Sequence, residues 1–277
     1  LTATKARALG RKGVIVGDRV GVVGDLSGAE GTLARIVEVL PRRTVLRRTA
    51  DDTDPFERPI VANADQLVIV TALADPPPRT GMIDRILVAA YDAGLDPVLC
   101  LTKEDLAPAD ELVAAYTPLD VPIVTVRPGS DLTDLRELLA GRTSVFIGHS
   151  GVGKSTLVNA LIPGVDRAIG EVNEVTGRGR HTSTAAIALE LPEHAGWVID
   201  TPGVRSFGLS HVTRESILAA FGDLAELTAG CPRGCTHGTG APECALDVAV
   251  EAGRLAPERL ESFRRMEGAW LERPASG

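Results

Sequence analysis

The sequence predicts an α/β protein in which a central domain with a mostly parallel sheet stands between a small N-terminal β-barrel and an α-helical, metal-binding C-terminal region. Three observations support this fold class. Short β-branched segments fill residues 13–50, strand-like and helix-like segments alternate from about residue 61, and three of the four cysteines crowd with a histidine into residues 231–244. Such alternation is typical of parallel sheets that carry helices on both faces.

The first 50 residues predict the barrel, or part of one. The segments "GDRVGVVGD" and "TLARIVEVL" are rich in β-branched residues, and the second alternates in part. These 50 residues hold 10 Lys and Arg against 4 Asp and Glu, a net charge of +6. The rest of the chain holds 19 Lys and Arg against 33 Asp and Glu, a net charge of −14. The asymmetry indicates a basic module that faces an anionic partner, or strand edges that carry solvated arginines.

The central part predicts four strands, each followed by a helix. In the first helix, Ile83, Ile86, Leu87 and Ala90 follow the i, i+3, i+4, i+7 pattern, and Gly94 ends it. Cys100 lies in an apolar strand-like segment and is expected in the core. The strands are "QLVIVTAL", "DPVLCL", "VPIVTV" and "TSVFIG", and helical patterns return after residue 211 in "TRESILAAF", "CALDVAVEAG" and "PERLESFRRMEGAW".

The composition is that of an ordinary globular protein, with 44% hydrophobic and 24% charged residues. No segment approaches the roughly 18 apolar residues of a membrane span, and the first residues lack the apolar core of a signal peptide. We therefore expect a cytoplasmic protein that does not contact membranes. The net charge of −8 argues against a uniformly basic coat that binds nucleic acid.

A glycine-rich segment, "GHSGVGKSTLVNAL" (148–161), follows a strand pattern and begins a helix. Its spacing, G-x4-G-K-S, is that of a phosphate-binding P-loop, in which backbone N–H groups and a helix N-terminus surround the phosphates. In such loops the lysine contacts the β- and γ-phosphates and the serine binds Mg²⁺. We expect a nucleotide at Gly148, His149, Ser150, Gly151, Val152, Gly153, Lys154, Ser155 and Thr156, with Ser155 as the magnesium ligand.

Two shorter motifs also follow strand patterns. "DTPG" (200–203) places Asp200 to hold Mg²⁺ through water and the Gly203 N–H to donate to a γ-phosphate. Alone, this D-x-x-G pattern is often only a turn. "TKED" (102–105) is similar to the N-K-x-D motif of GTPases, but could alone be a helix N-cap.

The "TKED" residues suit recognition of guanine. Asp105 can accept hydrogen bonds from guanine N1–H and N2–H₂, which adenine lacks, and the Lys103 stem can lie over the ring. Thr102 replaces the usual asparagine, which leaves open whether residue 102 still braces the neighbouring loop. Together with the P-loop, the two motifs favour GTP over ATP.

The order of the motifs differs from that of ordinary GTPases. Those proteins run from P-loop through D-x-x-G to N-K-x-D, whereas here T-K-x-D comes first and D-x-x-G comes last. This order is a circular permutation of the same sheet, which is possible where chain ends lie close together. The segment after D-x-x-G then leads into the helical C-terminal region, so hydrolysis can act on another domain.

Together, "VLRR", the P-loop segment, "GRGRHTST" (177–184) with "DTPGVRSFG", and the Cys/His cluster resemble the RsgA (YjeQ) family of circularly permuted GTPases that depend on the small ribosomal subunit. The resemblance implies an OB-fold barrel at 1–50, short for that fold, a permuted GTPase domain at 51–210 and a zinc-binding helical domain at 211–277. It also implies hydrolysis of GTP to GDP and phosphate, stimulated by the 30S subunit, in late maturation of that subunit.

The hydrolytic residues are expected in the "GRGRHTST" segment. Val204 stands where many GTPases carry a water-orienting glutamine, and valine cannot orient water. His181 is our candidate for that role. Thr182 or Thr184 is expected to bind Mg²⁺ and the γ-phosphate. Three arginines either spread transition-state charge or contact ribosomal RNA phosphates: Arg178, Arg180 and Arg205.

The Cys/His cluster predicts a structural zinc site. Cys231-x3-Cys235-x-His237-x6-Cys244 offers three thiolates and one imidazole, a complete tetrahedral set that leaves no open position for catalysis. The spacing that the family resemblance implies is x4, x and x5, so the two inner ligands are shifted by one residue. Glycines at 234, 238 and 240 can absorb that shift, and free buried thiols are the alternative.

Two other functions remain open from the sequence. One is an RNA-binding assembly scaffold with a structural nucleotide, and the other is a P-loop ATPase or kinase, against which Asp105 argues. Because aromatic residues make up only 3%, stacking on bases is not a plausible main contact with RNA. We expect a monomer that contacts 16S rRNA phosphates through Arg42, Arg43, Arg47 and Arg48.

Overall fold

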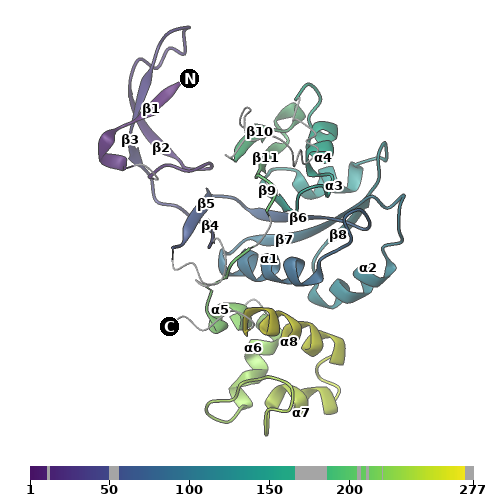
Figure 1. The fold of residues 1–277 in the computed structure, drawn as a ribbon. Coiled ribbons are helices and arrows are strands. Elements are labelled where there is room, and N and C mark those ends of the chain that lie inside the picture. Colours follow the sequence, from purple (N-terminus) through teal and green to yellow (C-terminus); the bar gives the residue numbers. More distant parts are fainter. Residues whose placement is uncertain are drawn as a thin grey trace, which may run out of the picture.

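The computed structural model describes residues 1–10, 13–49, 56–165, 186–204, 207–209, 212–219 and 221–271. Figure 1 shows three parts: an N-terminal sheet, a central sheet with its helices, and a group of C-terminal helices. None of the helices in the described residues is both long and apolar enough to cross a membrane.

The central sheet has six strands in the order β10-β11-β9-β6-β7-β8. All neighbours are parallel except β10 and β11, which pair antiparallel. The strands are β6 (Gln66–Ala72), β7 (Asp96–Thr102), β8 (Ile123–Val126), β9 (Arg142–Gly148), β10 (Ile187–Glu190) and β11 (Gly196–Asp200). The four predicted strands and the strand expected before D-x-x-G, β11, are confirmed, whereas the short edge strand β10 was not predicted.

Helices cover both faces of this sheet, as predicted. Along β6, Leu67 and Ile69 belong to one buried cluster and Val68 and Val70 to another, because successive strand residues face opposite sides. Buried Cys100 lies in the second cluster, where burial raises the pKa of its thiol to about 12. The helices of this part are α1 (Thr80–Asp92), α2 (Asp110–Tyr116), α3 (Thr133–Leu139) and α4 (Lys154–Leu161).

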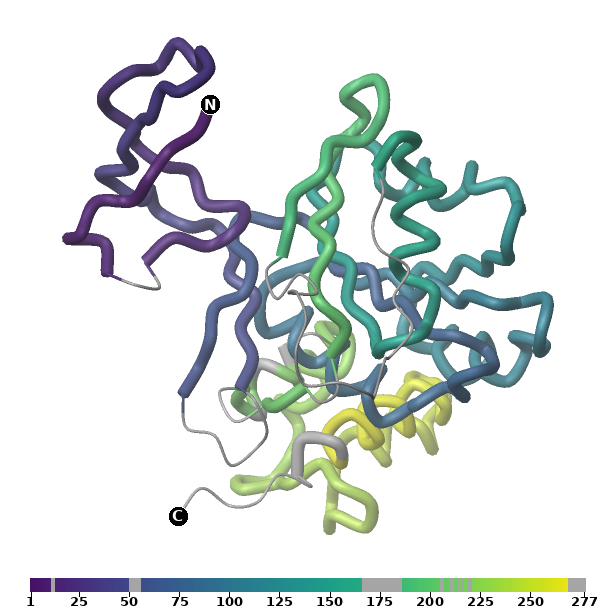
Figure 2. The backbone as a smooth tube through the Cα atoms, turned by 45° about the horizontal axis from the view of Figure 1, so that its top comes forward, coloured from purple at the N-terminus to yellow at the C-terminus, as the bar shows by residue number. Residues whose placement is uncertain are grey.

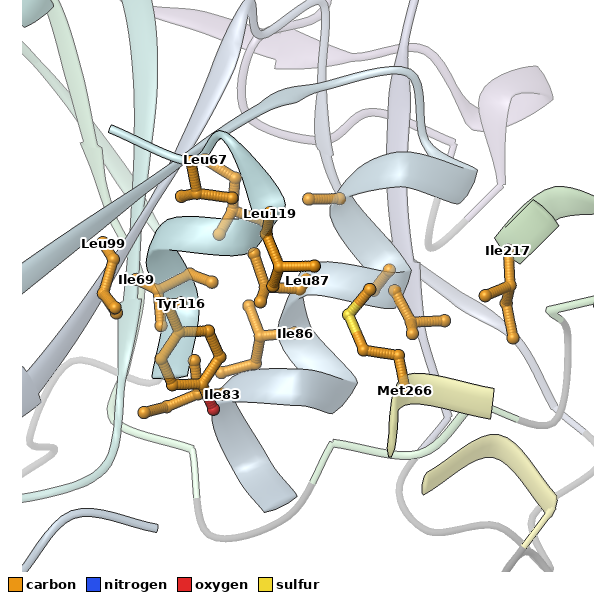
Figure 3. Packing of buried hydrophobic residues seen from close by; sticks show 14 of the residues in the cluster. Leu67, Ile69, Ile83, Ile86, Leu87, Leu99, Tyr116, Leu119, Ile217 and Met266 are labelled. Carbon is orange, nitrogen blue, oxygen red and sulfur yellow. The ribbon is translucent and has the colours of Figure 1, made fainter. Parts of the chain in front are cut away.

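The C-terminal helices share the first of these two clusters. In Figure 3, Met266 reaches toward Ile86 and Leu87 of α1, beside side chains from β6 and Tyr116. Next to this contact, Arg265 Nε donates to Asp84 Oδ2 over 3.1 Å, and Tyr116 donates to Asp84 Oδ1 over 2.9 Å. The helices are α5 (Arg214–Ala219), α6 (Gly222–Leu227), α7 (Ala245–Glu251) and α8 (Pro257–Leu271).

Asp84 is a buried ionisable group at this junction, with 2% of its surface exposed. Burial raises the pKa of its carboxyl, against the opposing effects of the Arg265 cation and the Tyr116 hydroxyl. Because a buried carboxylate without partners is costly, Arg265 and Tyr116 favour one fixed position of α8 on α1 and α2.

The N-terminal part is an open three-stranded sheet followed by a hairpin, and Figure 2 shows the sheet extending away from the central domain. The sheet contains β1 (Ala3–Lys5), β2 (Val20–Gly24) and β3 (Ala34–Val39) in the order β1-β3-β2. The hairpin is the antiparallel pair of β4 (Val45–Arg48) and β5 (Arg58–Ala62). The hairpin lies on both sides of residue 50, and its Leu46 and Val61 are buried with the central core. The division at residue 50 stays a prediction.

Two of the four arginines expected to contact RNA brace the chain between the N-terminal sheet and the central domain. Arg42 donates twice to the buried carboxylate of Asp18, over 2.7 and 2.9 Å, and this contact raises the pKa of the guanidinium. Arg43 donates to Asp65 and to the carbonyl of Ala64. The two guanidinium groups therefore have internal partners.

Candidate nucleotide and metal sites

The glycine-rich loop joins β9 to α4 and requires glycine for steric reasons. A Cβ on Gly148 would lie 2.3 Å from the carbonyl oxygen of Val70 on the adjacent strand, closer than atoms can approach. Gly151 and Gly153 have φ angles of +82° and +86°, which side chains other than glycine rarely adopt. The loop therefore turns tightly at the sheet edge, and α4 begins directly after it at Lys154.

The D-x-x-G segment lies against this loop. The Lys154 ammonium contacts the Asp200 carboxylate and the carbonyl of Thr201, and both charged side chains are buried. A Cβ on Gly203 would lie 3.3 Å from the backbone of Ser150, so the two loops touch. Ser155 is half-buried in the first turn of α4. One cation, one carboxylate and one hydroxyl thus surround a helix N-terminus, which suits a phosphate chain with a divalent cation.

The T-K-x-D loop is joined to the P-loop by a side-chain hydrogen bond. Thr102 Oγ1 lies 2.6 Å from the carbonyl oxygen of Val152 and 3.2 Å from that of Thr71, and it can donate to one of them at a time. The nearer bond braces the P-loop, so threonine does provide the brace that the sequence left open. Lys103 donates from its ammonium to the Asp75 carbonyl, which ties the same loop to the segment before α1.

Beside these two loops lies a cavity of about 310 Å³. Its wall includes Thr102 and Lys103 from the T-K-x-D loop and Gly153 and Thr156 from the P-loop. The third wall is the loop at 127–132, which follows β8 and which the sequence analysis did not identify. The general rule that ligands bind beyond the carboxyl ends of parallel strands could have drawn attention to it.

Of the expected nucleotide-binding residues, Thr102, Lys103, Gly153 and Thr156 line this cavity and the others do not. Asp105 is exposed in the adjoining turn and is absent from the residues that line the cavity. His149 lines a separate small space with Pro76, which precedes α1, and with Met82 and Ile83 of α1. Val204 is buried and its N–H donates to the Gly148 carbonyl over 3.0 Å, which fits the view that it does not orient water.

The expected hydrolytic residues lie outside the described residues. They are His181, Thr182 and Thr184, together with Arg178, Arg180 and Arg205. Their roles stay predictions.

The four expected metal ligands come together between α6 and α7. Their four ligand atoms, three sulfurs and one imidazole nitrogen, all lie within 4.8 Å of one another. The residues are Cys231, Cys235, His237 and Cys244. His237 Nδ1 is 3.5 Å from the Cys231 sulfur and 3.9 Å from the Cys244 sulfur. The donor set and its spacing therefore fit a tetrahedral ion such as Zn²⁺.

Backbone and side-chain contacts support this cluster. The His237 N–H donates to the Cys235 sulfur over 3.4 Å, and the Ala245 N–H donates to the Cys231 sulfur over 3.3 Å. Burial and the neighbouring thiols raise the pKa of Cys231, an effect that a bound cation would oppose. Arg264 on α8 donates to the His237 carbonyl over 2.9 Å and so ties the cluster to the last helix.

We predict that Thr102→Val weakens binding of GDP about five- to tenfold, because it removes the hydrogen bond to Val152 and leaves that carbonyl without its donor. Titration calorimetry would measure this change. Thr102→Ser, which keeps the hydroxyl, should bind like the wild type. Thr125→Val on the neighbouring strand β8 is the matched control. Equal GDP affinity of Thr102→Val and the wild type would contradict the bracing role.

We predict that a strong chelator removes one metal ion per chain and loosens residues 222–271 before residues 66–161, since metal binding and folding are coupled. Elemental analysis and hydrogen exchange would measure both effects. Cys235→Ser should lose the metal, whereas Cys100→Ala, which changes the cysteine outside the cluster, should retain it. A metal-free wild type with unchanged exchange would argue against the site.

Known proteins share both the sequence and the fold of this chain. The family model described as RsgA GTPase matches residues 39–210. The small ribosomal subunit biogenesis GTPase RsgA of Pseudomonas aeruginosa (strain LESB58) is 43% identical over 240 residues, which cover 83% of this chain and 69% of the relative. The protein of the same name from Pseudomonas syringae pv. tomato is 42% identical over 260 residues, which are 91% and 73% of the two chains.

Two solved structures of known proteins share the fold of this chain. The crystal structure of YjeQ from Thermotoga maritima has a TM-score of 0.70 at 30% identity and covers 98% of this chain and 90% of its own. YloQ, a circularly permuted GTPase, has a TM-score of 0.65 at 24% identity, with 98% and 87% covered, and supports the fold alone. The matched motifs, their permuted order and these likenesses show that the chain belongs to the RsgA GTPase family.

Proposed function

We propose that this protein hydrolyses GTP to GDP and phosphate and acts in late maturation of the 30S ribosomal subunit, with its turnover stimulated by that subunit. The observation that carries the proposal is the meeting of three motifs at one sheet edge. Lys154 contacts Asp200, and Thr102 contacts the P-loop beside the cavity. The names of the relatives, small ribosomal subunit biogenesis GTPases, supply the partner.

In this proposal the P-loop holds the phosphates and the metal. Lys154 moves from Asp200 to the β- and γ-phosphates, because phosphate oxygens carry more negative charge than one carboxylate. Ser155 binds Mg²⁺ directly and Asp200 holds it through water. The Gly203 N–H donates to the γ-phosphate, a role that its close approach to Ser150 supports.

The cavity between the T-K-x-D loop and residues 127–132 takes the guanine ring. Lys103 lies over the ring, and Asp105, exposed at the rim, turns inward to accept from guanine N1–H and N2–H₂. The Thr102 hydrogen bond to Val152 fixes the distance between the base loop and the phosphate loop.

Two further partners are proposed: ribosomal RNA, which binds exposed arginines, and a zinc ion, which binds the cysteine cluster. Arg42 is paired with the buried carboxylate of Asp18, so contacts with 16S rRNA phosphates fall to the more exposed arginines, such as Arg43 and Arg47, whose side chains are 59% and 45% exposed. The cluster at 231–244 holds one structural Zn²⁺, with all four ligands from the protein.

We predict that added 30S subunits raise phosphate release from GTP many-fold, and that Lys154→Ala lowers this release by at least about 100-fold because transition-state charge is no longer stabilised. Arg254→Ala, which removes an exposed cation after α7, is the control. Subunit binding without faster phosphate release would favour the alternative, an assembly scaffold with a structural nucleotide.

We predict that His181→Ala binds GDP normally but loses about 100-fold in subunit-stimulated turnover, because it no longer orients the attacking water. Single-turnover phosphate release would measure the change. His194→Ala, which removes an exposed histidine paired with Glu190, is the matched control. Full stimulated turnover of His181→Ala would exclude His181 from the mechanism.

A further inference from the structure

We infer that Arg127 reads the O6 and N7 edge of the guanine base and is a specificity-determining residue of this site. The inference rests on the proposed function, since it assumes that the cavity beside the P-loop takes the base. It adds a second group to recognition, opposite the edge that Asp105 is proposed to read.

The position of Arg127 is fixed by its own loop. It is the first residue after β8, and it lines the cavity together with Thr102 and Lys103. The Arg127 N–H donates to Ser130 Oγ over 3.2 Å, while the Ser130 hydroxyl and N–H donate back to the Arg127 carbonyl over 2.9 and 3.1 Å. This closed turn holds the Arg127 backbone in place at the wall of the cavity.

Arg127 is also the available cation of the cavity. Arg136 donates to the Ala160 carbonyl over 3.2 Å, and the Lys103 ammonium donates to the Asp75 carbonyl. The part of the chain that the structure describes gives the exposed Arg127 guanidinium no hydrogen bond or ion pair. Its full set of donors therefore remains for a ligand.

Two hydroxyl groups on this side of the cavity already donate within the protein. The Thr102 hydroxyl, at the position where N-K-x-D motifs carry an amide, has the Val152 and Thr71 carbonyls as acceptors for its one proton. The Ser130 hydroxyl donates to Arg127, and Pro128 has no N–H at all. Among the arginine and lysine side chains of the cavity, Arg127 therefore keeps its whole guanidinium fork for O6 and N7.

The chemistry of the guanidinium matches this edge of guanine. Guanine presents two adjacent acceptors, O6 and N7, and the fork of an arginine donates to both at once. Adenine presents N7 beside its N6 amino group. That amino group would face an N–H donor of Arg127, and this donor–donor contact disfavours adenine. Arg127 and Asp105 would thus bind complementary edges of one ring and oppose adenine independently.

The test compares binding of GTP, ATP and 7-deaza-GTP, in which a C–H group replaces N7, to the full chain by calorimetry. The wild type should bind 7-deaza-GTP about fivefold more weakly than GTP, and Arg127→Ala should bind GTP about tenfold more weakly than the wild type. In Arg127→Ala the difference between GTP and 7-deaza-GTP should disappear. Arg127→Lys keeps the charge without the fork and should also lose that difference.

Arg136→Ala is the matched control, since it removes the neighbouring cavity cation and should keep the wild-type ratio between GTP and 7-deaza-GTP. The inference is overturned if the wild type prefers GTP over ATP but binds 7-deaza-GTP equally well, or if Arg127→Ala retains the difference. A wild type that binds GTP and ATP equally would instead contradict the proposed function, so the two failures are distinguishable.

Discussion

The parallel register of the central strands is the constraint on which the nucleotide site depends. Parallel pairing sets Thr102 opposite Ala72 and Gly148 opposite Val70, so the strands β6, β7 and β9 end at one edge of the sheet. The adjacent strand β11 brings Asp200 to the same edge. Lys154 and Asp200 touch there although 46 positions separate them in the chain. Without this register the three motifs would remain unconnected loops.

Helix α1 connects this edge to the C-terminal helices through two consecutive residues. Arg85 donates to the carbonyl of Phe207, in the segment that follows D-x-x-G, over 2.8 Å. Asp84 accepts from Arg265 on α8. Because the permuted chain also runs from D-x-x-G into α5, the D-x-x-G segment is linked to the helical region both along the chain and across α1. The Cys/His cluster joins the same assembly through the Arg264 contact with His237.

The sequence was least informative where function depends on backbone partners. Thr102 stands where N-K-x-D motifs carry asparagine, and its hydroxyl reaches the Val152 carbonyl 50 positions away, a partner that no side-chain pattern reveals. Residues 127–132 match none of the three motifs described above, and they line the cavity because β8 pairs with β7. Strands β1 and β10 are short and half-exposed or exposed, so neither has the apolar pattern that marks a buried strand.

The sequence by itself determined the alternating strands and helices, the P-loop, the permuted motif order and the identity of four possible metal ligands. These features depend on local periodicity and on residue types at fixed spacing, which are properties of neighbouring residues. Only the tertiary structure decided that Arg42 and Arg43 form ion pairs within the chain, that His149 lies against α1 rather than in the larger cavity, and that Arg127 lines the cavity beside the P-loop. Those facts depend on strand pairing and helix packing between distant segments, which local patterns do not encode.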